Sequence, residues 1–185
     1  MSDFKLIAID GKSGSGKTSL AKGLAKIIDC NVFHMDDFFL TPDLRTQDRL
    51  NEIGGNVDYL RFENEVLKKI VTQETFKYKK FNCSDFSMAE SEEIFPKKIN
   101  IVEGCYSMHP SLINYYNFKI FMDIDFKLQK ERILNREGAE KLSRFLEEWI
   151  PKENLYFQTF NIKDSSDFII NNNEYICTDV KSYLI

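Results

Sequence analysis

The chain has 185 residues, of which 43% are hydrophobic and 29% are charged, a composition typical of a globular domain that can bury a sizeable core. Its formal net charge is −4 and its pI is near 5.3, so no overall positive field attracts nucleic acid or an anionic membrane, and we expect neither as a partner. No apolar run approaches the roughly 18 residues that a membrane span needs.

The N-terminus and the cysteines indicate where the protein works. The first ten residues, MSDFKLIAID, lack the basic and apolar segments of a signal peptide. The cysteines form no C-x-x-C pair and have no histidine at zinc-site spacing, which predicts reduced thiols and a cytoplasmic location. They are Cys30, Cys83, Cys105 and Cys177.

Short apolar segments and helical patterns alternate along the chain. Apolar residues recur at helical spacing after Lys17 and again from Tyr59 to Val71, with Asn56 as the expected N-cap, and residues 127–149 are a further predicted helical segment. Strands separated by helices predict an α/β fold, in which a five-stranded parallel sheet is covered on both faces as a three-layer α/β/α domain. The predicted strands are residues 4–10, 30–34, 99–103, 118–123 and 167–170.

Two further segments need an interpretation. Residues 41–56 are polar and rich in turn-forming residues, which predicts the longest loop there. Residues 153–158 spell ENLYFQ, the recognition sequence of a protease that is widely used to cut tags. A tag remnant should lie at a terminus, whereas ordinary sequence continues here to residue 185, so we interpret the match as coincidence and as part of the fold.

The sequence GKSGSGKT at residues 11–18 satisfies the phosphate-loop pattern G-x-x-x-x-G-K-[ST] between a predicted strand and a predicted helix. Such a loop turns its N–H groups toward phosphate oxygens, and the helix N-terminus adds partial positive charge. Lys17 should then reach the β- and γ-phosphates, and the Thr18 hydroxyl should bind Mg²⁺. The alternative, a plain Gly/Ser-rich turn, fits this context poorly. We therefore expect ATP and Mg²⁺ as cofactors, with nucleotide contacts from Gly11, Ser13, Gly14, Ser15, Gly16, Lys17, Thr18 and Ser19.

Two other nucleotide-binding patterns fail. A dinucleotide fingerprint that begins at Gly14 would need glycine at position 19, where Ser19 stands. The NIKD sequence at residues 161–164 has its lysine one place late for a guanine-reading motif, and it follows no predicted strand. A GTP-driven switch is therefore disfavoured.

Two adjacent carboxylates, Asp36 and Asp37, follow the second predicted strand in the sequence VFHMDDFFL. They should lie at the same edge of the sheet as the phosphate loop. A carboxylate there can accept the proton of an acceptor hydroxyl during phosphoryl transfer, and the aromatic residues around it would restrict water. The spacing alone leaves open the alternative that both aspartates only begin a loop.

Four segments in order resemble the uridine kinase family of P-loop kinases: GKSGSGKTSLAKGL, VFHMDDFF, GGNVDYLRFENEV and IVEGCYSMHP. HMDDFF is equally similar to the nicotinamide riboside kinases. The resemblance runs from about residue 4 to residue 170 and implies one P-loop kinase domain over residues 1–185, with a helical lid near residues 127–149. It implies that Asp36 is the catalytic base and that Asp58 contacts the ribose hydroxyls. The alternative for Asp58 is an acid that offsets the dipole of a helix start.

Glu103 ends a predicted strand directly before Gly104. This pair is similar to the family's Glu-Gly, which holds the Mg²⁺ shell or the substrate. The alternative is a plain polar end to a buried strand.

Arg132 and Arg136 are four residues apart and share one helix face. The resemblance implies that they close over the phosphates, where charge-assisted contacts steady the transferring group. Glu131 directly precedes Arg132 and Glu137 directly follows Arg136, so a solvated surface stays open as the alternative. The expected catalytic residues are Lys17, Asp36, Arg132 and Arg136.

The chain also departs from the family. Pyrimidine nucleoside kinases read the base with Tyr and His five residues apart, whereas here Cys83 follows Tyr78, and a thiol replaces an imidazole poorly. The expected lid also lacks the family's dense arginine clusters. His109 is either a substitute polar contact or a plain helix-start residue. The expected substrate contacts are Asp36, Asp58, Tyr78, Cys83, Glu103 and His109.

The predicted activity is ATP-dependent phosphorylation of a nucleoside-like small molecule. Uridine or cytidine is the leading acceptor. Nicotinamide riboside or another ribosylated small molecule is the alternative. A non-enzymatic ATP-binding regulator is a third interpretation from a different functional class. The sequence leaves open whether the chain forms a homo-oligomer.

Overall fold

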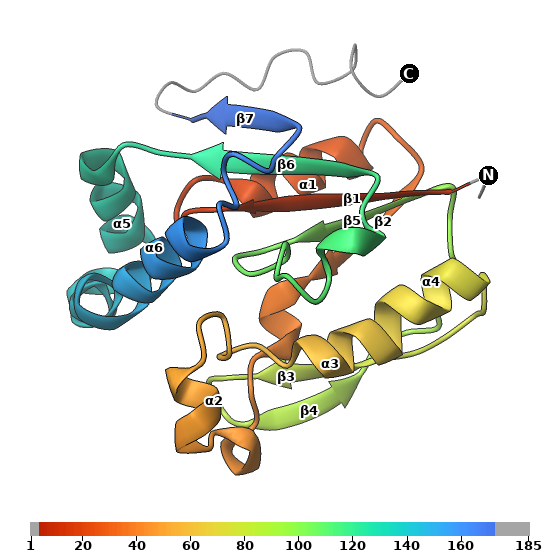
Figure 1. Cartoon of the computed structure of the whole chain (residues 1–185), viewed down its shortest axis with the longest axis horizontal. Helices are drawn as coiled ribbons and strands as arrows, with labels where there is room; N and C mark the ends of the chain where they lie inside the picture. Colours follow the sequence, from red (N-terminus) through yellow and green to blue (C-terminus); the bar gives the residue numbers. More distant parts are fainter. Residues whose placement is uncertain (1–3, 173–185) are drawn as a thin grey trace.

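The computed structural model describes residues 4–172, so Cys177 lies outside the described part of the chain. Its centre is a five-stranded sheet in the order β2-β5-β1-β6-β7, and all neighbouring strands run parallel (Figure 1). This confirms the predicted three-layer α/β/α architecture, with strand ends within one residue of those predicted. The strands are β1 (Lys5–Gly11), β2 (Cys30–His34), β5 (Ile99–Glu103), β6 (Phe118–Asp123) and β7 (Phe168–Asn171).

Alternate residues of β1 supply the two faces of the sheet. Ile7 and Ile9 pack with α1 (Lys17–Ala25), while Leu6 and Ala8 pack in a larger cluster with the helices on the opposite face. All four side chains are buried, as expected for a central parallel strand that is covered on both sides. Both faces of the sheet are therefore covered, and the parallel pairing places the strand carboxyl ends along one edge.

The second helical segment is continuous from α3 (Tyr59–Phe62) through a π-helical turn to α4 (Lys68–Thr72). Its N-cap is Asp58, whose carboxylate accepts a hydrogen bond of 3.0 Å from the backbone N–H of Arg61. The expected cap, Asn56, was therefore wrong by two residues, because the chain still pairs with its neighbour there: the Leu40 N–H donates to the Asn56 carbonyl at 3.1 Å.

The predicted loop over residues 41–56 contains a 3₁₀ turn, Pro42–Leu44, and one short helix, α2 (Gln47–Asn51). A hairpin of β3 (Lys79–Asn82) and β4 (Ser87–Glu90) lies outside the main sheet (Figure 1). The Arg61 guanidinium ties it to α3 through a hydrogen bond of 2.6 Å to the Lys79 carbonyl. The hairpin was not predicted.

The C-terminal helices are longer than predicted. α5 (Phe126–Arg144) continues through a π-helical turn into α6 (Ile150–Thr159), and Gly138 interrupts α5 with a φ of 84°. The ENLYFQ segment forms most of α6, and its Tyr156 and Phe157 side chains are buried in the core. The segment is therefore part of the fold. Among the described residues, no helix has the length and apolar character to cross a membrane.

Candidate active site

The phosphate loop joins β1 to α1 and depends on glycine at its two ends. Gly11 has a φ of 133°, and a side chain there would meet the Met122 carbonyl oxygen at 2.1 Å. Gly16 has a φ of 97° and immediately precedes the helix. The chain can therefore turn sharply at both points, which leaves the N-terminus of α1 open to the adjoining cavity.

Lys17 is buried and folds back onto the loop. Its ammonium donates hydrogen bonds to the carbonyls of Gly11 at 2.8 Å and Lys12 at 3.0 Å. The ammonium is thus held where the loop curls. Together, the glycine-rich backbone, a lysine ammonium and a helix N-terminus form a donor set that fits the phosphates of a nucleotide.

The Thr18 hydroxyl donates a hydrogen bond of 3.0 Å to Glu103, at the end of the neighbouring strand. Glu103 is only 4% exposed, and its same carboxylate oxygen lies 2.5 Å from Nδ1 of His34. This contact raises the pKa of His34. A hydroxyl and a carboxylate fit Mg²⁺, which takes one or two protein ligands and completes its shell with water and phosphate oxygens. Residues 4–172 hold no ready-made group of three metal-binding His, Cys, Asp or Glu side chains.

Asp36 and Asp37 have different surroundings, although they are neighbours in the 3₁₀ turn Met35–Phe38. Asp36 is exposed to the cavity that the phosphate loop lines. The surrounding protein walls desolvate its carboxyl group and raise its pKa, which nearby Lys17 partly offsets. Asp37 instead accepts a hydrogen bond of 2.9 Å from the Tyr78 hydroxyl. Only the first aspartate is therefore placed to meet a ligand in this cavity.

One cavity of about 1440 Å³ brings most of the expected residues together. Gly11 and Ser15 lie buried beside it, within the loop. Its volume can hold a nucleotide and a second small molecule side by side. Expected residues that line it are Ser13, Gly14, Gly16, Lys17, Thr18, Ser19, Asp36, Cys83, Glu103, Arg132 and Arg136.

The cavity lining does not include Asp58, Tyr78 or His109. The Asp58 carboxylate caps α3, and the Tyr78 hydroxyl is used by Asp37. His109 is buried, and desolvation lowers its pKa to about 4. Each side chain has a structural partner or environment of its own, so we leave these three residues out of the proposed site.

The two expected lid arginines come from α5. Arg132 donates a hydrogen bond of 3.3 Å to the Gly14 carbonyl, so this helix already contacts the phosphate loop. Arg136 is more exposed and pairs with Glu137 at 2.8 Å. Both line the cavity, and their positive charge faces the space beside the loop.

Sequence reasoning missed the residues that brace the loop from outside. The Ser13 N–H donates to the Glu153 carboxylate at 3.0 Å, and the Ser13 hydroxyl donates to the other oxygen of that carboxylate. Gln129 donates to the Ser13 carbonyl at 2.9 Å, and Asn172 donates to the Ser15 carbonyl at 2.6 Å. These residues lie in no contiguous motif, so only the folded chain reveals them.

Several residues that line the half of the cavity facing Asp36 were also not predicted. Arg45, Asn56 and Phe86 line it together with Cys83. The Arg45 side chain donates to the Leu40 carbonyl at 3.0 Å, and its guanidinium lies 5.7 Å from the centre of the Phe86 ring. The long loop and the unpredicted hairpin therefore form one wall of this half.

Comparisons with known proteins agree with this geometry. The sequence profile of the phosphoribulokinase / uridine kinase family matches residues 6–142. A search of curated protein sequences gave no significant match.

Several solved structures share the fold at low sequence identity. A possible uridine kinase from Bacillus stearothermophilus superposes with a TM-score of 0.70 at 16% identity, covering 92% of this chain and 90% of its own. A proposed fructose transport system kinase from Silicibacter sp. TM1040 gives 0.68 at 19% identity, with 90% and 89% covered. Shikimate kinase from Acinetobacter baumannii gives 0.50 at 14% identity, with 92% and 85% covered.

Proposed function

The chain belongs to the phosphoribulokinase / uridine kinase family, a family of P-loop kinases that phosphorylate small molecules, and we propose that it transfers phosphate from ATP to a hydroxyl of a nucleoside-type acceptor. The observation that carries this proposal is that Asp36 and the phosphate loop line the same cavity. Phosphoryl transfer needs an acceptor hydroxyl held beside the terminal phosphate, with a carboxylate to take its proton.

Asp36 acts in this proposal as the general base. Desolvation raises its pKa, which makes the carboxylate more basic than one in water, and it is exposed to the cavity where a hydroxyl can approach. Lys17 lies near enough to influence that pKa, so base and phosphate-binding lysine share one electrostatic environment. This is the arrangement that proton removal beside a phosphate requires.

The other residues of the proposed site would bind and orient Mg²⁺ and the phosphates. Thr18 and Glu103 would hold Mg²⁺, which neutralises phosphate charge when bound. Arg132 and Arg136 would face the transferring phosphate from α5, which together with α6 we propose as the lid of a single domain. The walls formed by the helices and the hairpin would limit water at the reacting hydroxyl.

Uridine or cytidine is the first acceptor to test, and nicotinamide riboside or another ribosylated small molecule is the second. Cys83 lines the acceptor half of the cavity, whereas the Tyr78 hydroxyl is bonded to Asp37. The family's Tyr–His pair for recognising pyrimidines is thus not reproduced. Nicotinamide riboside and other ribosylated small molecules are therefore tested as well. The HMDDFF sequence also supports this second class of acceptor.

A coupled assay of ADP release tests the proposal. The protein is incubated with ATP, Mg²⁺ and one acceptor at a time, and the panel includes uridine, cytidine, nicotinamide riboside and a purine nucleoside. We expect ADP release that depends on the acceptor, with GTP tested in place of ATP as a parallel arm. ATP binding without acceptor-dependent ADP release for any compound would favour a non-enzymatic ATP-binding regulator instead.

A further inference from the structure

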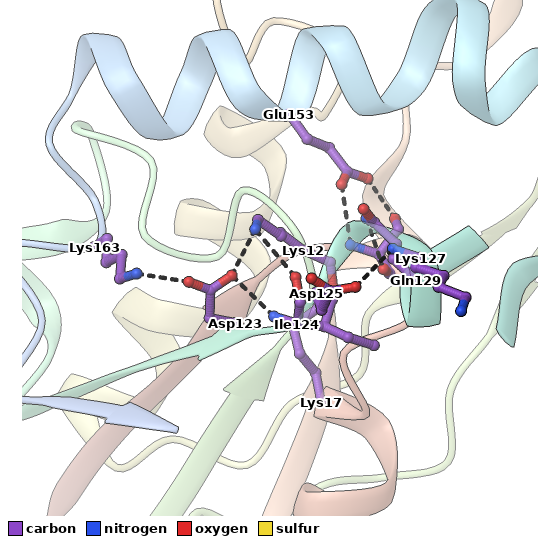
Figure 2. A network of polar contacts seen from close by, with 10 residues as sticks. Lys12, Lys17, Asp123, Ile124, Asp125, Lys127, Gln129, Glu153 and Lys163 are labelled. Carbon is purple, nitrogen blue, oxygen red and sulfur yellow. Dashed lines mark hydrogen bonds and ion pairs between the residues drawn. The ribbon is translucent and has the colours of Figure 1, made fainter. Parts of the chain in front are cut away.

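Glu153 is a buried carboxylate that the proposed transfer does not use. It lies on α6, is 4% exposed, and contributes to the wall of the cavity beside the phosphate loop. In Figure 2 it points from its helix toward the polar network that contains Lys12 and Gln129. Burying a carboxylate is unfavourable unless it has strong partners, so its position needs a specific reason.

Its partner is a single residue of the phosphate loop. Both oxygens of Glu153 accept hydrogen bonds from Ser13, one from the backbone N–H at 3.0 Å and one from the hydroxyl. Gln129 of α5 donates to the carbonyl of the same residue at 2.9 Å. All the polar groups of Ser13 are therefore held by the two C-terminal helices, which fixes the loop's path at this point.

The charge of Glu153 has a second effect. Burial raises the pKa of the Glu153 carboxyl overall. Nearby Lys17 lowers this pKa in part, whereas nearby Asp36 raises it further. The carboxylate therefore lies within electrostatic range of the lysine that is expected to hold the phosphates. An ionised carboxylate in that position repels the phosphates of a bound nucleotide, and the repulsion grows with their number.

We propose that Glu153 is a positioning residue that fixes the phosphate loop through Ser13 and, through its negative charge, weakens the binding of ATP more than that of ADP or AMP. The inference rests on the proposed function, because it takes the loop as the nucleotide site. It assigns to α6 a direct influence on nucleotide affinity. The Glu153 side chain then supports nucleotide binding by holding the loop in place and weakens it by repelling the phosphates.

Glu153→Gln separates the two effects. Glutamine keeps the length and can still accept the Ser13 N–H, but it carries no charge. We expect ATP to bind about tenfold more tightly than in the parent, ADP to gain less and AMP to stay within about twofold, because the repulsion scales with phosphate charge. The dissociation constants are measured by calorimetry at one ionic strength and at pH 8, because burial raises the pKa of Glu153 and a high pH favours its charged form.

Two further variants complete the test. Glu153→Asp keeps the charge but is one methylene too short to hold Ser13, so we expect the parent's ranking of affinities and a lower kcat. Glu147→Gln removes an exposed charge from the preceding helical turn and should leave all three affinities unchanged.

Equal gains for ATP, ADP and AMP in Glu153→Gln, or no gain, would overturn the proposal. Loss of its cooperative thermal transition would also overturn it, because Glu153 would then serve the fold alone. Failure of the proposed function looks different: the parent itself would bind no ATP, or would bind it without acceptor-dependent ADP release.

Discussion

The Thr18 hydroxyl and the Glu103 carboxylate, 85 residues apart in the chain, are joined by a hydrogen bond of 3.0 Å. The sheet produces this contact, because β1 and β5 are parallel neighbours and Ile9 is in register with Glu103. The phosphate loop follows β1 directly, so its threonine meets the last residue of β5. The order of the strands in the sheet thus brings the two proposed Mg²⁺ ligands together.

Glu103→Gln tests this pair. We expect the Mg²⁺ concentration for half-maximal activity to rise by about 10- to 100-fold, because a neutral amide binds the cation less well than a carboxylate. The measurement is a Mg²⁺ titration of the initial rate at fixed ATP. Thr18→Ser is the matched control, since it keeps the hydroxyl and should stay close to the parent. An unchanged Mg²⁺ requirement in Glu103→Gln would remove Glu103 from the proposed metal site.

The same carboxylate makes stability depend on pH through His34. The hydrogen bond to Glu103 raises the pKa of His34 above its usual 6.5 in the folded state. A raised histidine pKa contributes stability that is complete below 6.5 and is lost as the pH rises through the folded-state pKa. Urea unfolding of the parent and His34→Gln should therefore give a free-energy difference that is full below pH 6.5 and shrinks as the pH rises through the raised pKa of His34. A difference that is constant with pH would mean that this ion pair does not couple to folding.

Lys17→Ala should abolish turnover and leave the protein folded. In the proposed function the lysine neutralises phosphate charge that the protein does not carry in the absence of nucleotide, and its hydrogen bonds within residues 4–172 are to the carbonyls of Gly11 and Lys12. The ADP-release assay and a thermal melt of the same variant check the two halves of this expectation. If the cooperative melt disappears, Lys17 is needed for the fold itself.

Cys83→His tests whether this position reads the acceptor base. Cys83 is exposed and lines the cavity, so an imidazole there could offer both a donor and an acceptor. We expect relative kcat/KM to shift toward uridine and cytidine by about 1–3 kcal/mol, the usual effect of one well-placed polar partner. An unchanged ranking across the acceptor panel would place Cys83 outside the base site.

The strands of the sheet could be predicted because each is a short apolar run between turn signals. The hairpin of β3 and β4 could not, since Phe81 is its only buried residue and no alternating pattern marks it. The same contrast holds in the candidate site. The phosphate loop, Asp36 and Glu103 lie in contiguous motifs at strand ends, where topology brings them together. Glu153 reaches Ser13 across 140 residues, a contact that only packing of α6 against the loop creates.

Asp36 offers the sharpest test of the proposed chemistry because its neighbour provides an internal comparison. Asp36 is exposed to the cavity, whereas the Asp37 carboxylate accepts the Tyr78 hydroxyl and supports the fold. Asparagine has nearly the same shape as aspartate but cannot accept a proton at neutral pH. The same substitution at the two positions should therefore have different consequences.

We expect Asp36→Asn to lower kcat by about 10²–10⁴-fold, the usual contribution of a general base, while ATP affinity barely changes because the phosphate loop is untouched. Asp37→Asn should instead lower the melting temperature and leave kcat of the folded fraction near the parent value. Steady-state kinetics, calorimetric ATP binding and thermal melts of both variants decide between the roles. A loss of ATP binding at Asp36→Asn would indicate a metal ligand rather than a base. Equal losses of kcat at both positions, or a kcat within about threefold of the parent at Asp36→Asn, would refute the assignment.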